Sequence, residues 1–275
     1  MISGAVKSNR ERLDAKAVDM PSKDRDVGGE RERCLTGIEG LDLVLNGGIP
    51  RGNTVLVAGS VGTGKTSICI EFLVRGALEG ENSLYMSVTE ATSKLLRNVI
   101  PFDFFDDKLV RQGKLGFIDL PDLYEKLGID GDDIDSGQVR RLVDAIVDLI
   151  EGRDVRRFVL DSVTSVCYRL RDQEKIREFL LSLETALGAK DCTSLLVSEI
   201  GSTGEGYSRW GVEEAIADGV IVTGNLERRG DLLRTLQVVK MRGTSHSRAK
   251  YVLDLTTAGV LLVPLLKGGS VSGGG

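Results

Sequence analysis

The feature that most constrains the fold is a glycine-rich turn between an apolar strand and a helix. Residues Gly59–Thr66 read GSVGTGKT and match the pattern GxxxxGK[ST] in full. The run Thr54–Gly59 is apolar and β-branched, and a helical pattern follows the turn to about Gly80. A glycine-rich backbone lets successive N–H groups close around an anion, and the following helix adds its positive dipole end. A chance match is the alternative, but the flanking strand and helix favour a phosphate-binding turn.

The side chains of this turn have separate expected roles. Lys65 would neutralise the β- and γ-phosphates of a nucleotide, and the Thr66 hydroxyl would bind Mg²⁺. The residues expected to contact the bound nucleotide are Ser60, Val61, Gly62, Thr63, Gly64, Lys65, Thr66 and Ser67.

Two acidic residues that follow apolar strands are candidates to complete this site. Asp161 ends the run Arg157–Asp161 and is predicted to hold the magnesium ion, through its water shell. The alternative is that Asp161 caps a turn or helix. Glu90 follows the strand-like run Ser83–Val88 and is predicted to accept a proton from the attacking water. The alternative is that Glu90 is an acidic residue at a helix N-terminus.

The remaining sequence alternates strand and helix patterns. Apolar periodicity predicts helices over Gln138–Glu151 and Gln173–Leu187. We therefore expect an α/β fold with a mostly parallel central sheet flanked by helices, extended by antiparallel strands near the C-terminus. One domain is predicted over residues 34–266, between a flexible charged tail (1–33) and a flexible Gly/Ser tail (267–275). The further predicted strands are Gly116–Leu120, Thr193–Ser198, Gly219–Thr223, Leu236–Met241, Tyr251–Leu255 and Val260–Val263.

Composition excludes several other kinds of protein. The 275 residues include 36 basic and 41 acidic ones, a net charge of −5, which argues against a surface covered in positive charge for nucleic acid. The four cysteines are far apart and the single histidine is His246, so neither a zinc cluster nor a disulfide framework is indicated. No apolar run reaches the ~18 residues of a membrane span, and no signal stretch is visible, so we expect a cytoplasmic protein that contacts no membrane.

Further motifs lie before and after the phosphate-binding turn. They are Thr36–Asp42 leading to Gly47–Gly52, Arg157–Val166 (RFVLDSVTSV) and Lys240–His246 (KMRGTSH). With the turn itself, these segments resemble the KaiC-domain branch of the RecA-like ATPases. The turn is shared by many nucleotide-binding proteins, whereas KMRGTSH resembles a signature that is highly specific to this branch. The resemblance runs from about Cys34 to Pro264.

The resemblance implies a RecA-like P-loop core and a Mg-dependent, ATP-hydrolysing protein that acts as a nucleotide-driven regulator. It implies a ring, usually a hexamer, with ATP held between neighbouring subunits. Lys240 and Arg242 would then act in trans on the neighbour's γ-phosphate, and His246 would lie near the neighbour's nucleotide. From the residue pattern alone, Lys240 and Arg242 would instead form an exposed alternating face of a strand.

The chain also departs from this family at three places. The family has two consecutive glutamates after the second strand, but here the pair reads Thr89-Glu90, which puts efficient hydrolysis in doubt. The phosphorylated Ser-Thr pair of the clock protein falls on Glu214 and Ala215, so we do not expect an autokinase cycle. The family's acidic residue on the adenine side falls on Thr257, which leaves base selectivity open.

Two other functions stay open at this stage. A recombination accessory factor related to RecA or RadA would bind single-stranded DNA through Gly201–Gly211, where Tyr207, Arg209 and Trp210 offer stacking and charge. A subunit-interface or nucleotide-sensing loop is the alternative for that segment. A nucleotide-gated scaffold with little hydrolysis would follow from Thr89. The protein partner of any of these activities is not identified by the sequence.

Overall fold

The structure is a computed structural model that describes residues 32–129, 133–200 and 206–265. The tails predicted over residues 1–33 and 267–275 lie outside the described residues, apart from Glu32 and Arg33. Arg33 belongs to a short strand, β1 (Arg33–Cys34), which pairs with β2 (Ile49–Pro50). Arg33 therefore takes part in strand pairing within the described chain.

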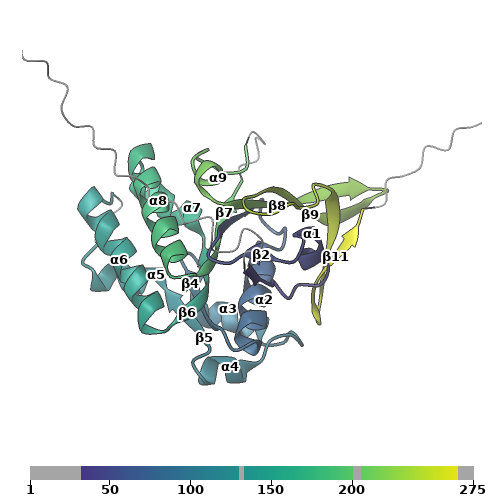
Figure 1. Ribbon diagram of the computed structural model, residues 1–275, viewed down its shortest axis with the longest axis horizontal. Coiled ribbons are helices and arrows are strands. Elements are labelled where there is room, and N and C mark those ends of the chain that lie inside the picture. Colours follow the sequence, from purple (N-terminus) through teal and green to yellow (C-terminus); the bar gives the residue numbers. More distant parts are fainter. Residues whose placement is uncertain (1–31, 130–132, 201–205, 266–275) are drawn as a thin grey trace, which may run out of the picture. The chain divides into compact units, whose positions relative to one another are not determined.

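The main sheet of the described chain has nine strands in the order β11-β10-β9-β8-β3-β7-β6-β4-β5 (Figure 1). The six strands from β8 to β5 are parallel to their neighbours. From β8 outward, β9, β10 and β11 pair antiparallel. This arrangement confirms the predicted fold class. The strand bounds are β3 (Thr54–Gly59), β4 (Asn82–Ser87), β5 (Leu115–Asp119), β6 (Val155–Asp161), β7 (Thr193–Glu199), β8 (Gly219–Arg228), β9 (Asp231–Met241), β10 (Lys250–Thr256) and β11 (Gly259–Pro264).

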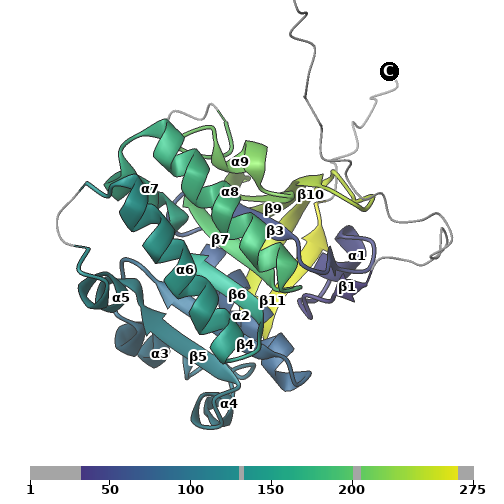
Figure 2. The same cartoon turned by 60° about the vertical axis from the view of Figure 1, so that its left-hand side comes forward.

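Helices pack on both faces of this sheet, and α6 and α8 lie side by side on one of them (Figure 2). One apolar core contains residues of α1 (Leu41–Val44), α2 (Lys65–Leu78), α3 (Thr92–Val99) and α4 (Asp107–Arg111). The other core contains residues of α5 (Leu120–Lys126), α6 (Ser136–Gly152), α7 (Val163–Leu170), α8 (Gln173–Ala189) and α9 (Glu213–Ile216).

The central strand β3 explains why the sequence before the turn is apolar throughout. Successive side chains of a strand point to opposite faces. Val55 and Val57 accordingly enter one core, while Leu56 and Ala58 enter the other. Because both faces are covered, the strand shows a continuous apolar run rather than an alternating one. This double burial fixes the position of the turn that follows β3.

Side-chain caps set where several helices begin. Asp135 and Gln138 form a capping box at the start of α6, and Asp172 accepts two backbone N–H bonds at the start of α8. Ser162 accepts the Ser165 N–H at 3.3 Å and begins α7. Losing one such cap costs about 1 kcal/mol. Since Ser162 is the cap of α7, the alternative role for Asp161 as that cap is wrong.

The predicted strands and the two long helices all occur, with ends that differ by a few residues. The short helices α1, α3, α4, α5, α7 and α9 were not expected from the sequence. No helix within the described ranges combines the length and the apolar character needed to cross a membrane.

Candidate functional site

The glycine-rich turn connects the carboxyl end of β3 to the first residue of α2. Gly62 and Gly64 have φ angles of 78° and 92°, in the left-handed region that favours glycine. A Cβ at Gly59 would lie 2.1 Å from the Thr223 hydroxyl oxygen, so the strand end also requires glycine. The sequence pattern therefore corresponds to real backbone requirements at three positions.

Two side chains of the turn point in opposite directions. Thr63 is fully buried; its hydroxyl donates to the Ser60 carbonyl at 2.8 Å and lies 2.7 Å from the Thr223 hydroxyl. Val61 is 83% exposed. Thr63 can therefore offer a ligand only its backbone, as the predicted cradle requires, while its side chain stiffens the turn from inside.

Lys65 lies at the mouth of the turn. Its Nζ donates to the carbonyl oxygens of Gly59 and Ser60, each at 2.8 Å. Burial lowers the pKa of Lys65, and the nearby carboxylates of Glu199 and Asp161 oppose that shift. The amine thus lies where phosphate oxygens would enter. Its two hydrogen bonds to carbonyl oxygens could be replaced by bonds to phosphate.

Thr66 and Asp161 meet at the same edge of the sheet. The Thr66 hydroxyl donates to Asp161 Oδ2 at 2.9 Å, and the Tyr85 hydroxyl donates to the same oxygen at 2.6 Å. Burial raises the pKa of the Asp161 carboxyl, while these two hydrogen bonds act to lower it. Burial and the Asp161 carboxylate raise the pKa of Tyr85 well above its usual range. A hydroxyl and a carboxylate beside a lysine are the hard oxygen donors that Mg²⁺ prefers, so the residues present fit this ion.

Glu90 lies just beyond β4, which is next to β6 in the sheet. Its carboxylate forms an ion pair with Lys94 of α3 at 3.2 Å. The adjacent Thr89 is exposed, and both residues line a hollow with Asp119. Glu90 therefore follows the expected strand, but its carboxylate pairs with a helix lysine instead of contacting Lys65.

Three residues near the turn were not singled out from the sequence. Tyr85 binds Asp161, as described above. Glu199 ends β7 opposite Gly59 in the β3–β7 register. Arg234 of β9 donates to the Gly62 carbonyl at 3.0 Å. The rule that selected Asp161, a carboxylate at the end of an apolar strand, would also have selected Glu199, whereas no local signal marks Arg234.

Lys240 and Arg242 lie away from the turn of their own chain. Lys240 Nζ donates to the carbonyls of Glu214, Ala215 and Ala217 at 3.0, 3.3 and 2.6 Å. These groups belong to the last turn of α9 and the residue after it. Arg242 donates to the Ala215 carbonyl at 3.3 Å as well. Both cations therefore bind the C-terminal end of a short helix, where its dipole is negative.

Strand register puts these two cations near the amino ends of the parallel strands. This is the opposite edge of the sheet from the turn, which follows the carboxyl end of β3. Gly59 pairs with Thr223 of β8, whereas the Arg242 N–H bonds the Asp218 carbonyl, five residues earlier along the chain. Five residues of strand span about 17 Å. Arg242 is thus too far along the sheet to reach a phosphate bound in its own chain's turn.

His246 follows on the same segment. Its Nε2 is buried and makes no hydrogen bond within the part of the chain that the structure describes. Burial, with a contribution from Arg248, lowers its pKa.

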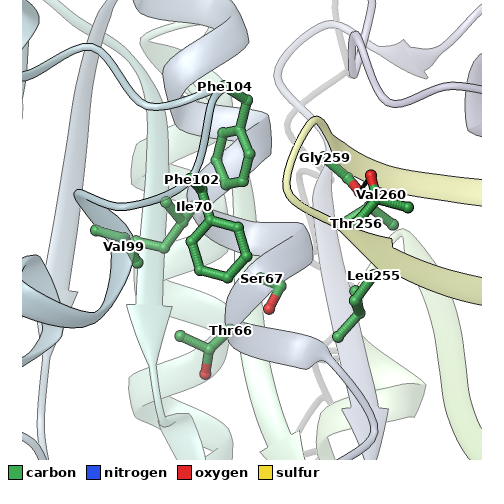
Figure 3. A pocket seen from close by; sticks show the side chains of 10 residues that line it. All are labelled: Thr66, Ser67, Ile70, Val99, Phe102, Phe104, Leu255, Thr256, Gly259 and Val260. Atoms are coloured by element: carbon green, nitrogen blue, oxygen red, sulfur yellow. Dashed lines mark hydrogen bonds between the residues drawn. The ribbon is translucent and has the colours of Figure 1, made fainter.

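A small apolar pocket of about 40 Å³ lies beside the start of α2. Figure 3 shows the Phe102 and Phe104 rings on one side, facing Leu255 and Thr256 on the other. Its lining residues are Thr66, Ser67, Ile70, Val99, Phe102, Phe104, Leu255, Thr256, Gly259 and Val260. The wall formed by β10 and β11 is anchored to α2, because Glu71 accepts the Val260 N–H at 2.6 Å.

The segment proposed for DNA contact is only partly described, since residues 201–205 lie outside the described ranges. Trp210 packs edge-on against Tyr168, with ring centroids 5.8 Å apart, and the Arg209 guanidinium lies 4.9 Å from the same ring. Tyr207 is 43% exposed. Two of the three side chains expected to bind DNA therefore contact a ring of their own chain.

Comparisons with known proteins identify the family and the fold. The sequence model described as ATPase: KaiC matches residues 34–267. The chain is 34% identical to a UPF0273 protein of Thermotoga maritima over 85% of this chain and 96% of that protein. It is 33% identical to the circadian clock oscillator protein KaiC of Synechococcus elongatus, over 85% of this chain and 44% of that protein. The solved structure of a KaiC-like protein from Pyrococcus horikoshii matches with a TM-score of 0.72 and 33% identity, over 85% of this chain and 99% of that one. The chain belongs to the KaiC ATPase family.

Proposed function

We propose that this protein binds ATP with Mg²⁺ at the glycine-rich turn and hydrolyses it, as a nucleotide-driven regulator. The observation that carries the proposal is the meeting of Thr66 and Asp161 at 2.9 Å beside Lys65, at the open end of the turn. These are the three side chains that a phosphate-binding turn needs for charge neutralisation and for a metal ion. Membership of the KaiC family supports nucleotide binding independently.

Each group would act on a different part of the ligand. Lys65 Nζ would exchange its contacts with the Gly59 and Ser60 carbonyls for phosphate oxygens. Thr66 and Asp161 would hold the magnesium ion, which supplies positive charge to the β- and γ-phosphates when bound. The backbone N–H groups of the turn would bind the remaining phosphate oxygens.

Glu90 is proposed to accept the proton of the attacking water. The water oxygen would bond to the γ-phosphorus, the bond to the bridging oxygen would break, and ADP and phosphate would leave. Glu90 must first give up its 3.2 Å ion pair with Lys94. This ion pair is expected to slow hydrolysis. A second reason to expect slow hydrolysis is that the chain has Thr89 where a second carboxylate would lie.

The nucleotide's base is proposed to enter the apolar pocket beside Thr66. Two phenylalanine rings, Phe102 and Phe104, offer flat faces for stacking. In the ring that the family resemblance implies, which we expect to be a hexamer, ATP would be held between subunits, and a second subunit would complete the nucleotide site.

Lys240, Arg242 and His246 are proposed to come from that second subunit. The support is that Arg242 lies about 17 Å of strand from its own turn, and that Lys240 pairs with Val220, three residues before Thr223, on the same side. In a head-to-tail ring, this edge of one subunit can face the turn of the next. The two cations would then exchange the carbonyls of α9 for the neighbour's γ-phosphate.

The experiment that tests the site is Lys65→Ala, with Lys190→Ala as a matched control. Lys190, the residue after α8, forms a surface ion pair with Glu151 of α6 at 2.5 Å. We expect Lys65→Ala to abolish binding of a fluorescent ATP analogue and ATP turnover, and the control to keep both. Turnover that survives in Lys65→Ala would show that the site is assigned wrongly. Oligomeric mass with and without Mg-ATP tests the ring.

A nucleotide-gated scaffold is the second candidate function. The observation that favours it is the Glu90–Lys94 ion pair, which keeps the carboxylate of the proposed proton acceptor paired with a lysine. ATP would then hold the assembly together with little turnover. Equal, near-zero turnover in the wild type and in Glu90→Gln would favour this scaffold over the ATPase.

A further inference from the structure

The Asp161 carboxylate has a neighbour that the proposed nucleotide contacts do not use. Tyr85 of β4 is 2% exposed, and its hydroxyl donates to Asp161 Oδ2 at 2.6 Å. The Thr66 hydroxyl donates to the same oxygen at 2.9 Å. One carboxylate oxygen thus accepts two hydrogen bonds, one from a strand and one from the helix after the phosphate-binding turn.

The sheet itself fixes the position of Tyr85. In the β4–β6 register Tyr85 pairs with Val159, two residues before Asp161, and all three side chains point to the same face. The Tyr85 ring packs on Phe117 of the adjacent strand β5, with ring centroids 5.8 Å apart. The phenol therefore has packing on one side and Asp161 on the other, which leaves it little freedom to move.

The two donors differ in what they can do once a nucleotide is bound. Thr66 is itself a candidate magnesium ligand, so its hydroxyl cannot serve as the only group that orients Asp161. Tyr85 lies behind the carboxylate within the core and is a neutral donor over the usual pH range. Its hydrogen bond can persist while Asp161 binds the ion on its open side.

We propose that Tyr85 is a positioning residue of the magnesium site, which holds the Asp161 carboxylate in its ion-binding orientation. This inference rests on the proposed function. A partner that orients a metal ligand is typically responsible for about 10- to 100-fold in metal affinity. Tyr85 should therefore affect the magnesium requirement of nucleotide binding, and leave nucleotide binding without the ion unchanged.

The test is Tyr85→Phe, which removes one oxygen and keeps the ring that packs on Phe117. The matched control is Tyr124→Phe, because Tyr124 is also a buried tyrosine, at 3% exposure, on helix α5. Binding of a fluorescent ATP analogue is titrated with MgCl₂, and also measured in EDTA. We expect the Mg²⁺ midpoint of Tyr85→Phe to rise about 10-fold or more. Its affinity in EDTA should stay within about twofold of the wild type, and the control should match the wild type in both conditions.

The outcomes separate this inference from the proposed function. If the wild type does not bind the analogue, the proposed function fails and the inference with it. If the wild type shows a magnesium effect and Tyr85→Phe shows the same midpoint, only the inference is overturned. A Tyr85→Phe chain that loses affinity equally in EDTA and in Mg²⁺ would assign Tyr85 a structural role and also overturn it.

A double-mutant cycle gives a second, independent measurement. In an Asp161→Ala background the tyrosine hydroxyl has no carboxylate to orient. Tyr85→Phe should then cause no further rise in the Mg²⁺ midpoint, whereas independent residues would give additive effects. Additivity would overturn the inference even if the single variant behaves as expected.

Discussion

The two edges of the main sheet are built in different ways. At the carboxyl ends of β3 and β6, side chains bind one another: Thr66 and Tyr85 both donate to Asp161. At the opposite edge, the side chains of Lys240 and Arg242 bind backbone carbonyls at the end of α9. The side chains at the first edge are hydrogen-bonded to one another within one chain. The second edge presents two cations whose hydrogen bonds within the described chain go to α9, to Ala217 directly after it and to Asp218.

This difference suggests separate roles for the two edges in the proposed nucleotide binding. A buried carboxylate that is hydrogen-bonded within its own chain can be positioned before any ligand arrives. Cations that bind the carbonyls at a helix C-terminus are stabilised by partial negative charges. A phosphate carries full negative charges and would bind the same cations more strongly. This difference supports the proposal that the second edge acts on a nucleotide held by a neighbouring subunit.

The largest expected effect comes from mixing two inactive variants. Lys65→Ala damages the first edge and Arg242→Ala the second, and each should lose about 100-fold or more in turnover. In a mixed ring, some sites combine an intact turn on one subunit with an intact Arg242 on the next. Equal mixing should restore about a quarter of wild-type turnover, because two independent halves must coincide. Steady-state ATP hydrolysis of the mixture measures this recovery.

The control for this mixture is each variant mixed with itself, at the same total concentration. Failure to recover activity, although both variants enter one assembly by mass measurement, would contradict action in trans. In that case Lys240 and Arg242 would keep only the role the structure describes, binding the end of α9.

An intermediate effect is expected where the first edge itself is incomplete. Thr89→Glu introduces the second carboxylate at an exposed position beside Glu90. We expect turnover to rise by about 3- to 10-fold, because a second carboxylate can accept the water proton while Glu90 is paired with Lys94. Thr89→Gln is the matched control, which has the same length but no charge and should leave turnover unchanged. A rise in both variants would argue for a packing effect instead of proton transfer.

The sequence predicts the first edge much better than the second. Gly59–Thr66 is a local pattern whose backbone requirements are all within one segment, and Asp161 ends a run that only a doubly covered strand would show. Parallel strands bring such ends to one edge, so the meeting of Thr66 and Asp161 follows from topology.

What could not be predicted depends on register and on short elements. Tyr85 reaches Asp161 only because β4 pairs with β6 in one particular register. The contacts of Lys240 depend on α9, a four-residue helix with too few positions to show periodicity. Arg234 reaches Gly62 because β9 pairs antiparallel with β8, and no residue pattern near Arg234 predicts this pairing.

The smallest expected effect concerns His246, the chain's one histidine, and it probes the second edge directly. Burial and Arg248 lower its pKa, so below about pH 6.5 the unfolded chain binds more protons than the folded one. The unfolding free energy should therefore rise with pH through the window below 6.5, and His246→Gln should remove that part of the slope. The resonances of the one imidazole of this chain in ¹H NMR measure the same titration.

If His246 lies near a neighbour's nucleotide, Mg-ATP should move its pKa upward, because nearby phosphate charge favours the protonated ring. A titration that ATP leaves unchanged would contradict the trans position of this residue, whatever the mixed rings show for Arg242.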